Sequence, residues 1–233
     1  MDHFLNQNQM KAKVTQKALE YFSVKSRLGI GTGSTVEHLI KQLIPLLHAG
    51  SHRMAFSSKK SEMLLKPYCN SDFSDQFTEL DFYIDGADYV DCHGVMIKGG
   101  GGALTREKIL MQASQRVIIC IDETKWVDQP KQVILPIEIL PFAPQVTLHR
   151  LTHLIKTGNL RRLSNDQPFI TDNGNFIFDA LIDFPHEQIH ELNLQLKQVA
   201  GVVETGIFDQ FSIDLLMAYR DPNRPVEAIS FNS

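Results

Sequence analysis

The chain has 233 residues, of which 43% are apolar and 21% charged, and these proportions are typical of a globular protein with a sizeable core. The formal net charge of -4 excludes a bulk attraction to nucleic acid or to an anionic membrane, so we expect a small-molecule partner and no nucleic acid. The cysteines Cys69, Cys92 and Cys120 have no CxxC spacing, which argues against a disulfide framework and a zinc site and favours reduced, buried thiols. No apolar run approaches the length of a signal or membrane segment, which predicts a cytoplasmic protein.

Helices and strands alternate through the first half of the chain. The apolar residues Val14, Ala18, Leu19 and Phe22 have helical spacing, and short apolar runs that end at glycine or polar residues predict strands. This alternation is typical of a doubly wound (Rossmann-like) α/β fold with a mainly parallel sheet. The predicted strands cover 28–30, 54–56, 82–84 and 117–121, and the predicted helices cover 14–22, 36–47, 59–65 and 103–113.

A glycine-rich turn, Gly31–Thr35, separates the first strand from its helix. Ser34 is either the N-cap of that helix, with Glu37 as its capping-box partner, or part of a phosphate site formed by the amides and hydroxyls of Thr32–Thr35. The spacing leaves both interpretations open. The turn fits neither a GxxxxGK[ST] loop nor a complete GxGxxG, so a nucleotide site is not indicated.

Lysines near two other strand ends also have two interpretations. Lys59 and Lys60 form either a solvated helix start, which is the commoner case, or a ligand clamp. Lys125 follows the strand over 117–121 and is either a substrate contact or a surface lysine.

The segment Asp81–Met111 concentrates the residues that we expect to carry chemistry. Asp85 and Asp88 are predicted at the carboxyl end of a strand, where open α/β sheets bind ligands. Lys98 precedes four glycines whose backbone can approach a ligand and direct N–H groups at an anion. Glu107 falls within the apolar stripe of the helix over 103–113, so its carboxylate is expected on the buried side.

Beyond residue 130 the pattern predicts a smaller inserted α+β domain. VILPIEILPFA is extended, 146–155 and 186–199 have helical patterns, and Asn173-Gly174 predicts a hairpin turn. We expect a catalytic domain of residues 1–130 and 204–233 and a small domain of residues 131–203, with the chain from Val202 to Tyr219 returning to the main sheet. The nine histidines have no HExxH or HxH spacing, which argues against a catalytic metal.

Seven segments in this order resemble type A ribose-5-phosphate isomerase. They are GIGTGST at 29–35, YIDGAD at 83–88, IKGGGGALTREK at 97–108, DETK at 122–125, PIEILPFA at 136–143, TDNGN at 171–175 and GVVETGIF at 201–208. The resemblance spans nearly the whole chain, and DGAD followed by KGGGGALTREK is its most specific part.

The resemblance implies interconversion of ribose 5-phosphate and ribulose 5-phosphate through an enediolate, in the non-oxidative branch of the pentose phosphate pathway, with neither metal nor cofactor and with a homodimer or higher homo-oligomer. It also implies that Glu107 is the proton-transferring base and that Asp85, Asp88 and Lys98 surround the sugar oxygens. The remaining implied substrate contacts are Thr32, Gly33, Ser34, Thr35, Gly86, Ala87, Gly99, Gly100, Gly101 and Lys125.

The chemistry itself requires these residue types. A proton that moves between adjacent carbons needs one base, and desolvation on an apolar helix face raises the basicity of a glutamate such as Glu107. Lys98 and the glycine amides can stabilise the enediolate oxygen, and an aspartate can shuttle protons on the sugar hydroxyls. The alternative is structural: Glu107 pairs with a core arginine and Asp85 only ends a turn.

Three positions depart from the family pattern: Tyr89, Lys59-Lys60-Ser61 and Lys156-Thr157-Gly158. The first two bear on affinity and substrate range, and the third on packing or assembly.

Two rival functions remain. A sugar-phosphate sensor needs a DNA-reading module, and no basic helix-turn-helix precedes residue 27. A CoA transferase would form a covalent intermediate on a carboxylate.

Overall fold

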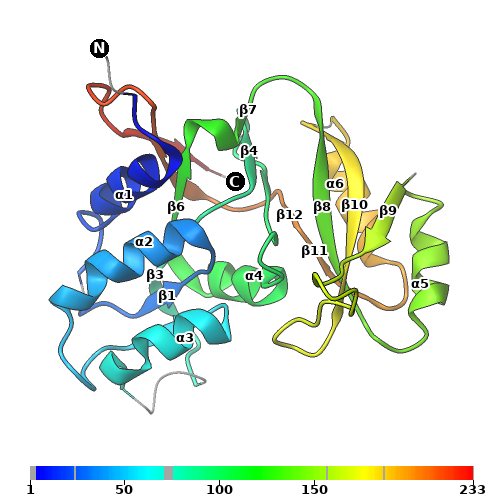
Figure 1. Cartoon of the computed structure of the whole chain (residues 1–233), viewed down its shortest axis with the longest axis horizontal. Helices are drawn as coiled ribbons and strands as arrows, with labels where there is room; N and C mark the ends of the chain where they lie inside the picture. The colour runs from blue at the N-terminus through cyan, green and yellow to red at the C-terminus, as the bar shows by residue number, and fades with distance from the viewer. Residues whose placement is uncertain (1–3, 24, 71–75, 156, 186, 233) are drawn as a thin grey trace. The chain divides into compact units, whose positions relative to one another are not determined.

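The computed structural model describes residues 4–23, 25–70, 76–155, 157–185 and 187–232, and the chain forms two compact units (Figure 1). Unit 1 comprises residues 1–87, 106–126 and 210–233, and unit 2 comprises residues 88–105 and 127–209. The predicted fold class is confirmed, because unit 1 has a mainly parallel sheet with helices and unit 2 is built on antiparallel strands.

Unit 1 is organised around a six-stranded sheet in the order β14-β13-β6-β3-β1-β2. All neighbouring pairs are parallel except β13 and β14, which form an antiparallel edge. The strands are β1 (Leu28–Ile30), β2 (Met54–Phe56), β3 (Leu80–Asp85), β6 (Ser114–Asp122), β13 (Ile213–Ala218) and β14 (Glu227–Phe231). The helices are α1 (Gln7–Ala18), α2 (Ser34–Leu43), α3 (Lys59–Leu65) and α4 (Leu104–Gln112).

Helices α1 and α2 pack against each other, and α1 also contacts β6 and β13 (Figure 1). Their apolar side chains form one core with the strand residues Ile30, Ile84 and Ile118. Because side chains alternate along a strand, Tyr83 and Asp85 point to the opposite face from Ile84. Tyr83 is fully buried there.

The chain reverses direction across the sheet between β1 and β3. After β1 it passes through α2 to β2 on one side, and it then returns to place β3 on the other side of β1. Ligands of doubly wound sheets bind at the carboxyl ends of the two strands that flank such a switch point. The turn Gly31–Thr35 and Asp85 occupy these two strand ends.

Unit 2 contains two small sheets. The first has the order β11-β8-β10-β9 and is antiparallel, and the second has the order β12-β5-β4-β7. Its helices are α5 (Pro144–Leu151) and α6 (Ile189–Lys197). The strands of the first sheet are β8 (Lys131–Ile139), β9 (Thr157–Leu160), β10 (Phe176–Phe184) and β11 (Val202–Thr205). Those of the second are β4 (Tyr89–Asp91), β5 (Met96–Ile97), β7 (Trp126–Val127) and β12 (Ile207–Phe208).

The prediction that the segment from Val202 to Tyr219 returns to the main sheet was wrong for its first half. Strand β11 pairs with β8, β12 pairs with β5, and only β13 joins the six-stranded sheet. The partners of β11 and β12 are distant in sequence, so their short apolar runs could not identify them. Unit 2 accordingly extends beyond the predicted 131–203 to include residues 88–105, 127–130 and 204–209.

Two smaller expectations also differ from the structure. The first helix begins at Gln7, because Asn6 and Gln9 form a capping box, and it ends at Ala18. Cys92 is exposed, whereas Cys120 is buried as expected. Lys156 and His186, which belong to predicted segments, lie outside the described residues.

Candidate active site

Asp85 ends β3 in unit 1 and is held there by three hydrogen bonds. The hydroxyl of Tyr83 donates to Oδ2 over 2.5 Å, and the N–H groups of Thr32 and Gly86 donate to Oδ1 over 3.2 and 2.8 Å. Only 1% of Asp85 is exposed. Its carboxylate is therefore an oriented group at the switch point and more than the end of a turn.

Two glycines of β1 and its turn make room for this arrangement. A Cβ atom on Gly29 would lie 2.9 Å from the ring of Tyr83, and one on Gly31 would lie 2.0 Å from Cγ of Asp85. Any side chain at Gly31 would displace the carboxylate. The glycines of GIGTGST thus serve the buried pair Tyr83 and Asp85.

The turn Thr32–Thr35 leads into α2 with its backbone N–H groups at the helix start. The N-cap is Gly33, at φ 94°, and it makes no side-chain capping bond, so the interpretation of Ser34 as an N-cap was wrong. Instead, Oγ of Ser34 accepts a hydrogen bond from Nζ of Lys11 over 3.0 Å. Lys11 is 8% exposed and places a positive charge beside the turn. A helix N-terminus with an added cation is suited to an anion such as phosphate.

Two serines at the start of α3, the N-cap Ser58 and Ser61, hold the same turn from the other side. Oγ of Ser58 donates to Oγ1 of Thr32 over 2.9 Å, and Oγ of Ser61 donates to the carbonyl of Gly31 over 2.7 Å. Lys60, by contrast, forms an ion pair with Glu37, and both side chains are exposed. This agrees with the interpretation of the Lys59-Lys60 pair as a solvated helix start.

Glu107 lies in the first turn of α4 and is 3% exposed. Its neighbours on the predicted stripe, Leu104, Leu110 and Met111, are buried as well, so the carboxylate does lie on an apolar face. Burial and the negative charges of Asp85 and Glu107 raise the pKa of Tyr83 well above its ordinary value. The Tyr83 hydroxyl therefore stays protonated and remains a donor to Asp85.

Lys125 is half-buried and ends a short 3-10 helix, Glu123–Lys125, that follows β6. Since β6 pairs in parallel with β3, Lys125 follows the same edge of the sheet that carries Asp85. This position is compatible with a substrate contact.

In unit 2, Asp88 is linked to the glycine run. The N–H of Gly100 donates to Oδ2 of Asp88 over 2.8 Å, and the N–H of Asp88 donates to the carbonyl of Ile97 over 3.0 Å. Gly99 and Gly102 have positive φ values of 100° and 77°, which disfavour other residues there. Asp88 and the glycine backbone are therefore organised together.

Lys98 is 3% exposed, and its Nζ atom lies 5.6 Å from the centre of the Phe208 ring on β12. A cation over an aromatic face is stabilised by the ring quadrupole. Such a buried ammonium next to the glycine run can act as an electrophile toward an oxyanion.

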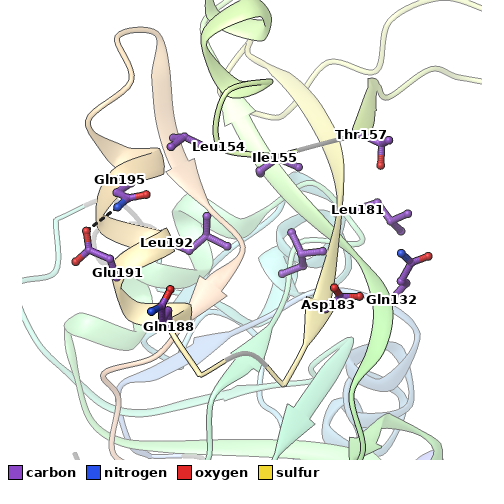
Figure 2. A pocket seen from close by; sticks show the side chains of 11 residues that line it. Gln132, Leu154, Ile155, Thr157, Leu181, Asp183, Gln188, Glu191, Leu192 and Gln195 are labelled. Carbon is purple, nitrogen blue, oxygen red and sulfur yellow. Dashed lines mark hydrogen bonds between the residues drawn. The ribbon is translucent and has the colours of Figure 1, made fainter.

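Unit 2 also contains a surface pocket of about 560 Å³ (Figure 2). Leu154, Ile155 and Leu192 form an apolar part, and Nε2 of Gln195 donates to Glu191 at the rim over 2.8 Å. None of the described residues that line it is a lysine, arginine or histidine, and none is a predicted site residue. The described part of the lining therefore offers no cation of the kind that a sugar phosphate requires.

Within the described ranges, no cluster of three or more His, Cys, Asp or Glu side chains is arranged to hold a metal ion. In the same part of the chain, every helix is too short or too polar to cross a membrane.

The residues that sequence patterns missed are Tyr83, Lys11 and Ser58, whereas Ser61 was named only as part of a departure from the family pattern. Tyr83 had been identified only as a strand former, although its spacing from Asp85 by two residues places both side chains on one face. Lys11 reaches the turn from α1, and Ser58 and Ser61 reach it from the start of α3, so no pattern local to the turn marks them.

Comparisons with known proteins agree on one family. The family model described as ribose 5-phosphate isomerase A (phosphoriboisomerase A) matches residues 54–222. A ribose-5-phosphate isomerase A of Picrophilus torridus is 36% identical over 225 residues, which cover 96% of this chain and 99% of that protein. The structure of ribose 5-phosphate isomerase from Plasmodium falciparum has a TM-score of 0.83 and 29% identity, covering 97% of this chain and 99% of that one. A D-ribose-5-phosphate isomerase in complex with phospho-erythronic acid has a TM-score of 0.81 and 31% identity, covering 97% of this chain and 100% of the other.

Proposed function

We propose roles for the site residues of this chain, which belongs to the ribose 5-phosphate isomerase A family and interconverts ribose 5-phosphate and ribulose 5-phosphate. Glu107 is the base that removes the proton from C2 of the aldose and returns it to C1. The observation that carries this assignment is the burial of its carboxylate in the apolar stripe of α4. A carboxylate withdrawn from water is a stronger base toward carbon than a solvated one.

The polar groups around the strand ends and the glycine run handle the oxygens. Lys98 and the amides of Gly99–Gly101 stabilise the enediolate oxygen as negative charge develops on it. Asp85, which its three donors hold in one orientation, accepts hydrogen bonds from sugar hydroxyls. Asp88 is half-buried and exchanges protons with the ring oxygen and the C1 hydroxyl during ring opening. Gly86 and Ala87 supply backbone contacts.

The phosphate group is held by the turn Thr32–Thr35 through its amides and hydroxyls, together with Lys125. Lys11 adds a second cation to this site, because its ammonium is bonded to Ser34. Phospho-erythronic acid has a phosphate at one end and a carboxylate at the other, so it should compete with the substrate in this chain. Its carboxylate carries a negative charge like the one that develops on the enediolate oxygen of the substrate.

The assignment of the base is tested with Glu107→Gln, which keeps the size of the side chain and abolishes its basicity. We expect kcat to fall by roughly 10²–10⁴, the usual contribution of general acid–base catalysis, with little change in KM. Glu191→Gln, an exposed substitution on α6, is the matched control. Solvent deuterium should enter the product of the wild-type enzyme at C1, and Glu107→Gln should lose this exchange.

Wild-type turnover in a folded Glu107→Gln variant would assign proton transfer to another residue. The same assay in excess EDTA tests metal independence, which we propose because Lys98 can serve as the electrophile. Loss of activity on chelation, restored by one divalent ion, would contradict that proposal.

We propose further that the chain acts in the cytoplasm as a homodimer or larger homo-oligomer. Three apolar side chains around the start of α5 support self-association: Leu140, Phe142 and Val146 are 46%, 86% and 65% exposed. Sedimentation at working concentrations should give at least twice the chain mass of 26.4 kDa. A monomeric mass would contradict the assembly.

A further inference from the structure

Arg161 is a half-buried arginine of unit 2 that follows β9 and contacts the glycine run. Its Nε and Nη2 atoms donate to the two carboxylate oxygens of Asp179 over 2.8 and 2.5 Å, which is the bidentate geometry of a strong ion pair. Its guanidinium also lies 5.5 Å from the centre of the Phe169 ring. Both side chains of the pair are mostly shielded from solvent, at 15% and 24% exposure. The guanidinium is thus fixed by a carboxylate and an aromatic face.

The remaining donor of Arg161 bonds to the glycine backbone. Nη1 donates to the carbonyl oxygens of Gly99 and Gly100 over 3.2 and 3.0 Å, across a separation of about sixty residues in sequence. The backbone of Arg161 is itself fixed, since its N–H donates to the carbonyl of Ile177 over 2.8 Å and its carbonyl accepts from Phe169 over 2.9 Å. A rigid arginine therefore sets the orientation of two successive peptide groups.

The orientation of these carbonyls decides where the glycine N–H groups point. In a trans peptide the carbonyl and the next N–H point in opposite directions. Because the carbonyl of Gly99 points to Arg161, the N–H of Gly100 points away from it, and it does donate to Asp88 over 2.8 Å. By the same geometry, the N–H of Gly101 also points away from Arg161, toward the side on which the Asp88 carboxylate lies.

We propose that Arg161, anchored by Asp179, is a positioning residue for the glycine run. By fixing the Gly99 and Gly100 carbonyls, it keeps the N–H of Gly100 on the Asp88 carboxylate and directs the N–H of Gly101 at the reacting sugar oxygens. This inference rests on the proposed assignment of the glycine run to the substrate. Neither Arg161 nor Asp179 belongs to the segments by which the sequence resembles the family. Arg161 touches only protein groups and acts through the loop.

The test compares Arg161→Ala and Arg161→Lys with Arg162→Ala. Arg162 is the matched control, because it is 51% exposed and its Nη1 donates to the carbonyl of Asp166 in its own loop over 2.7 Å. Lysine keeps the charge but cannot form the planar fork to Asp179 and the two carbonyls together. We expect kcat to fall by about ten- to a hundredfold in Arg161→Ala, as for a misplacement of about 1 Å, and KM to change by less than about threefold.

Two further readouts separate positioning from mere folding. Added guanidinium ions should restore part of the lost kcat in Arg161→Ala and leave Arg162→Ala unchanged. Amide hydrogen exchange, followed by mass spectrometry on the peptide that covers 98–103, should accelerate in Arg161→Ala, because the N–H groups of Gly100 and Gly102 lose their fixed acceptors.

The outcomes distinguish this inference from the assignment on which it rests. Unchanged exchange in Arg161→Ala overturns the positioning role whatever the activity. Faster exchange with wild-type kcat keeps the structural contact but overturns the catalytic part of the inference, and it leaves the proposed function standing, which Glu107→Gln tests separately. A fall in kcat without guanidinium rescue, matched by a lower unfolding temperature, shows a purely structural arginine and overturns the proposal.

Discussion

Tyr83→Phe removes a single buried hydroxyl and tests whether the orientation of Asp85 matters for catalysis. The hydroxyl donates to Oδ2 of Asp85 over 2.5 Å, and both residues are almost completely buried. A hydrogen bond to a charged group contributes about 1.5–3 kcal/mol, so the free energy of unfolding should fall by that amount. In a chain of this size, this loss lowers Tm by roughly 3–12 °C.

The same bond holds the carboxylate in its place, so its loss should also lower kcat/KM. If the whole 1.5–3 kcal/mol is lost from the transition state, kcat/KM falls by about ten- to a hundredfold. The measurement is isomerase kinetics together with urea unfolding, and Tyr68→Phe, a half-buried tyrosine at the edge of the unit 1 core, is the control. If Tyr83→Phe keeps both the stability and the kcat/KM of the wild type, Tyr83 does not orient Asp85.

Two other predictions follow from the structure. Lys11→Met keeps the packing of the stem but removes the charge beside Ser34, so KM for ribose 5-phosphate should rise by about tenfold. Turnover of unphosphorylated ribose should stay the same, and an equal loss for both sugars would place the phosphate elsewhere. Burial raises the pKa of Cys69 to about 11, so at pH 8 only about 0.1% of this thiol is ionised. The exposed Cys92 should therefore react with a disulfide reagent more than about a hundredfold faster than Cys69. The difference should shrink as the pH rises toward 11, because Cys69 then ionises; equal rates at pH 8 would contradict the burial of Cys69.

Local patterns in the sequence predicted much of the fold. Short apolar runs that ended at Gly31 and Asp85 placed both strand ends correctly, since the signal for a strand and its turn lies within a few residues. The alternation of strands and helices then gave the doubly wound sheet, and the apolar spacing around Glu107 predicted the burial of its carboxylate. The roles of the site residues in catalysis stay predictions.

Contacts between distant segments could not be predicted in this way. Lys11 reaches Ser34 from a separate helix, and a lysine on the polar side of an amphipathic pattern gives no sign of burial. Strand β11 has the length and composition of a main-sheet strand, and only its pairing with β8 assigns it to unit 2.

The segments PIEILPFA (136–143) and TDNGN (171–175) resemble the family. Local sequence patterns gave a structural reason only for the Asn173-Gly174 turn in the second segment. Glu138, in the first, is fully buried, and its carboxylate accepts hydrogen bonds from the second segment. It also accepts one from Thr105, which lies at the start of α4, three residues after the glycine run. The donors are Thr171 Oγ1 at 2.8 Å, Asn173 Nδ2 at 3.2 Å, Asn175 Nδ2 at 2.9 Å and Thr105 Oγ1. Unit 2 therefore holds the glycine run at both ends, through Arg161 at its start and Glu138 after it.

The two aspartates of DGAD are alike in sequence but differ in how firmly they are held. Asp85 is 1% exposed and accepts hydrogen bonds from a tyrosine hydroxyl and two backbone N–H groups, which fix both of its oxygens. Asp88 is half-buried and accepts a bond from a glycine N–H. A fixed carboxylate suits the binding of sugar hydroxyls, whereas proton exchange during ring opening requires access to water. Loss of the Tyr83 hydroxyl should therefore affect isomerisation of the open-chain sugar more than ring opening, which would depend on Asp88.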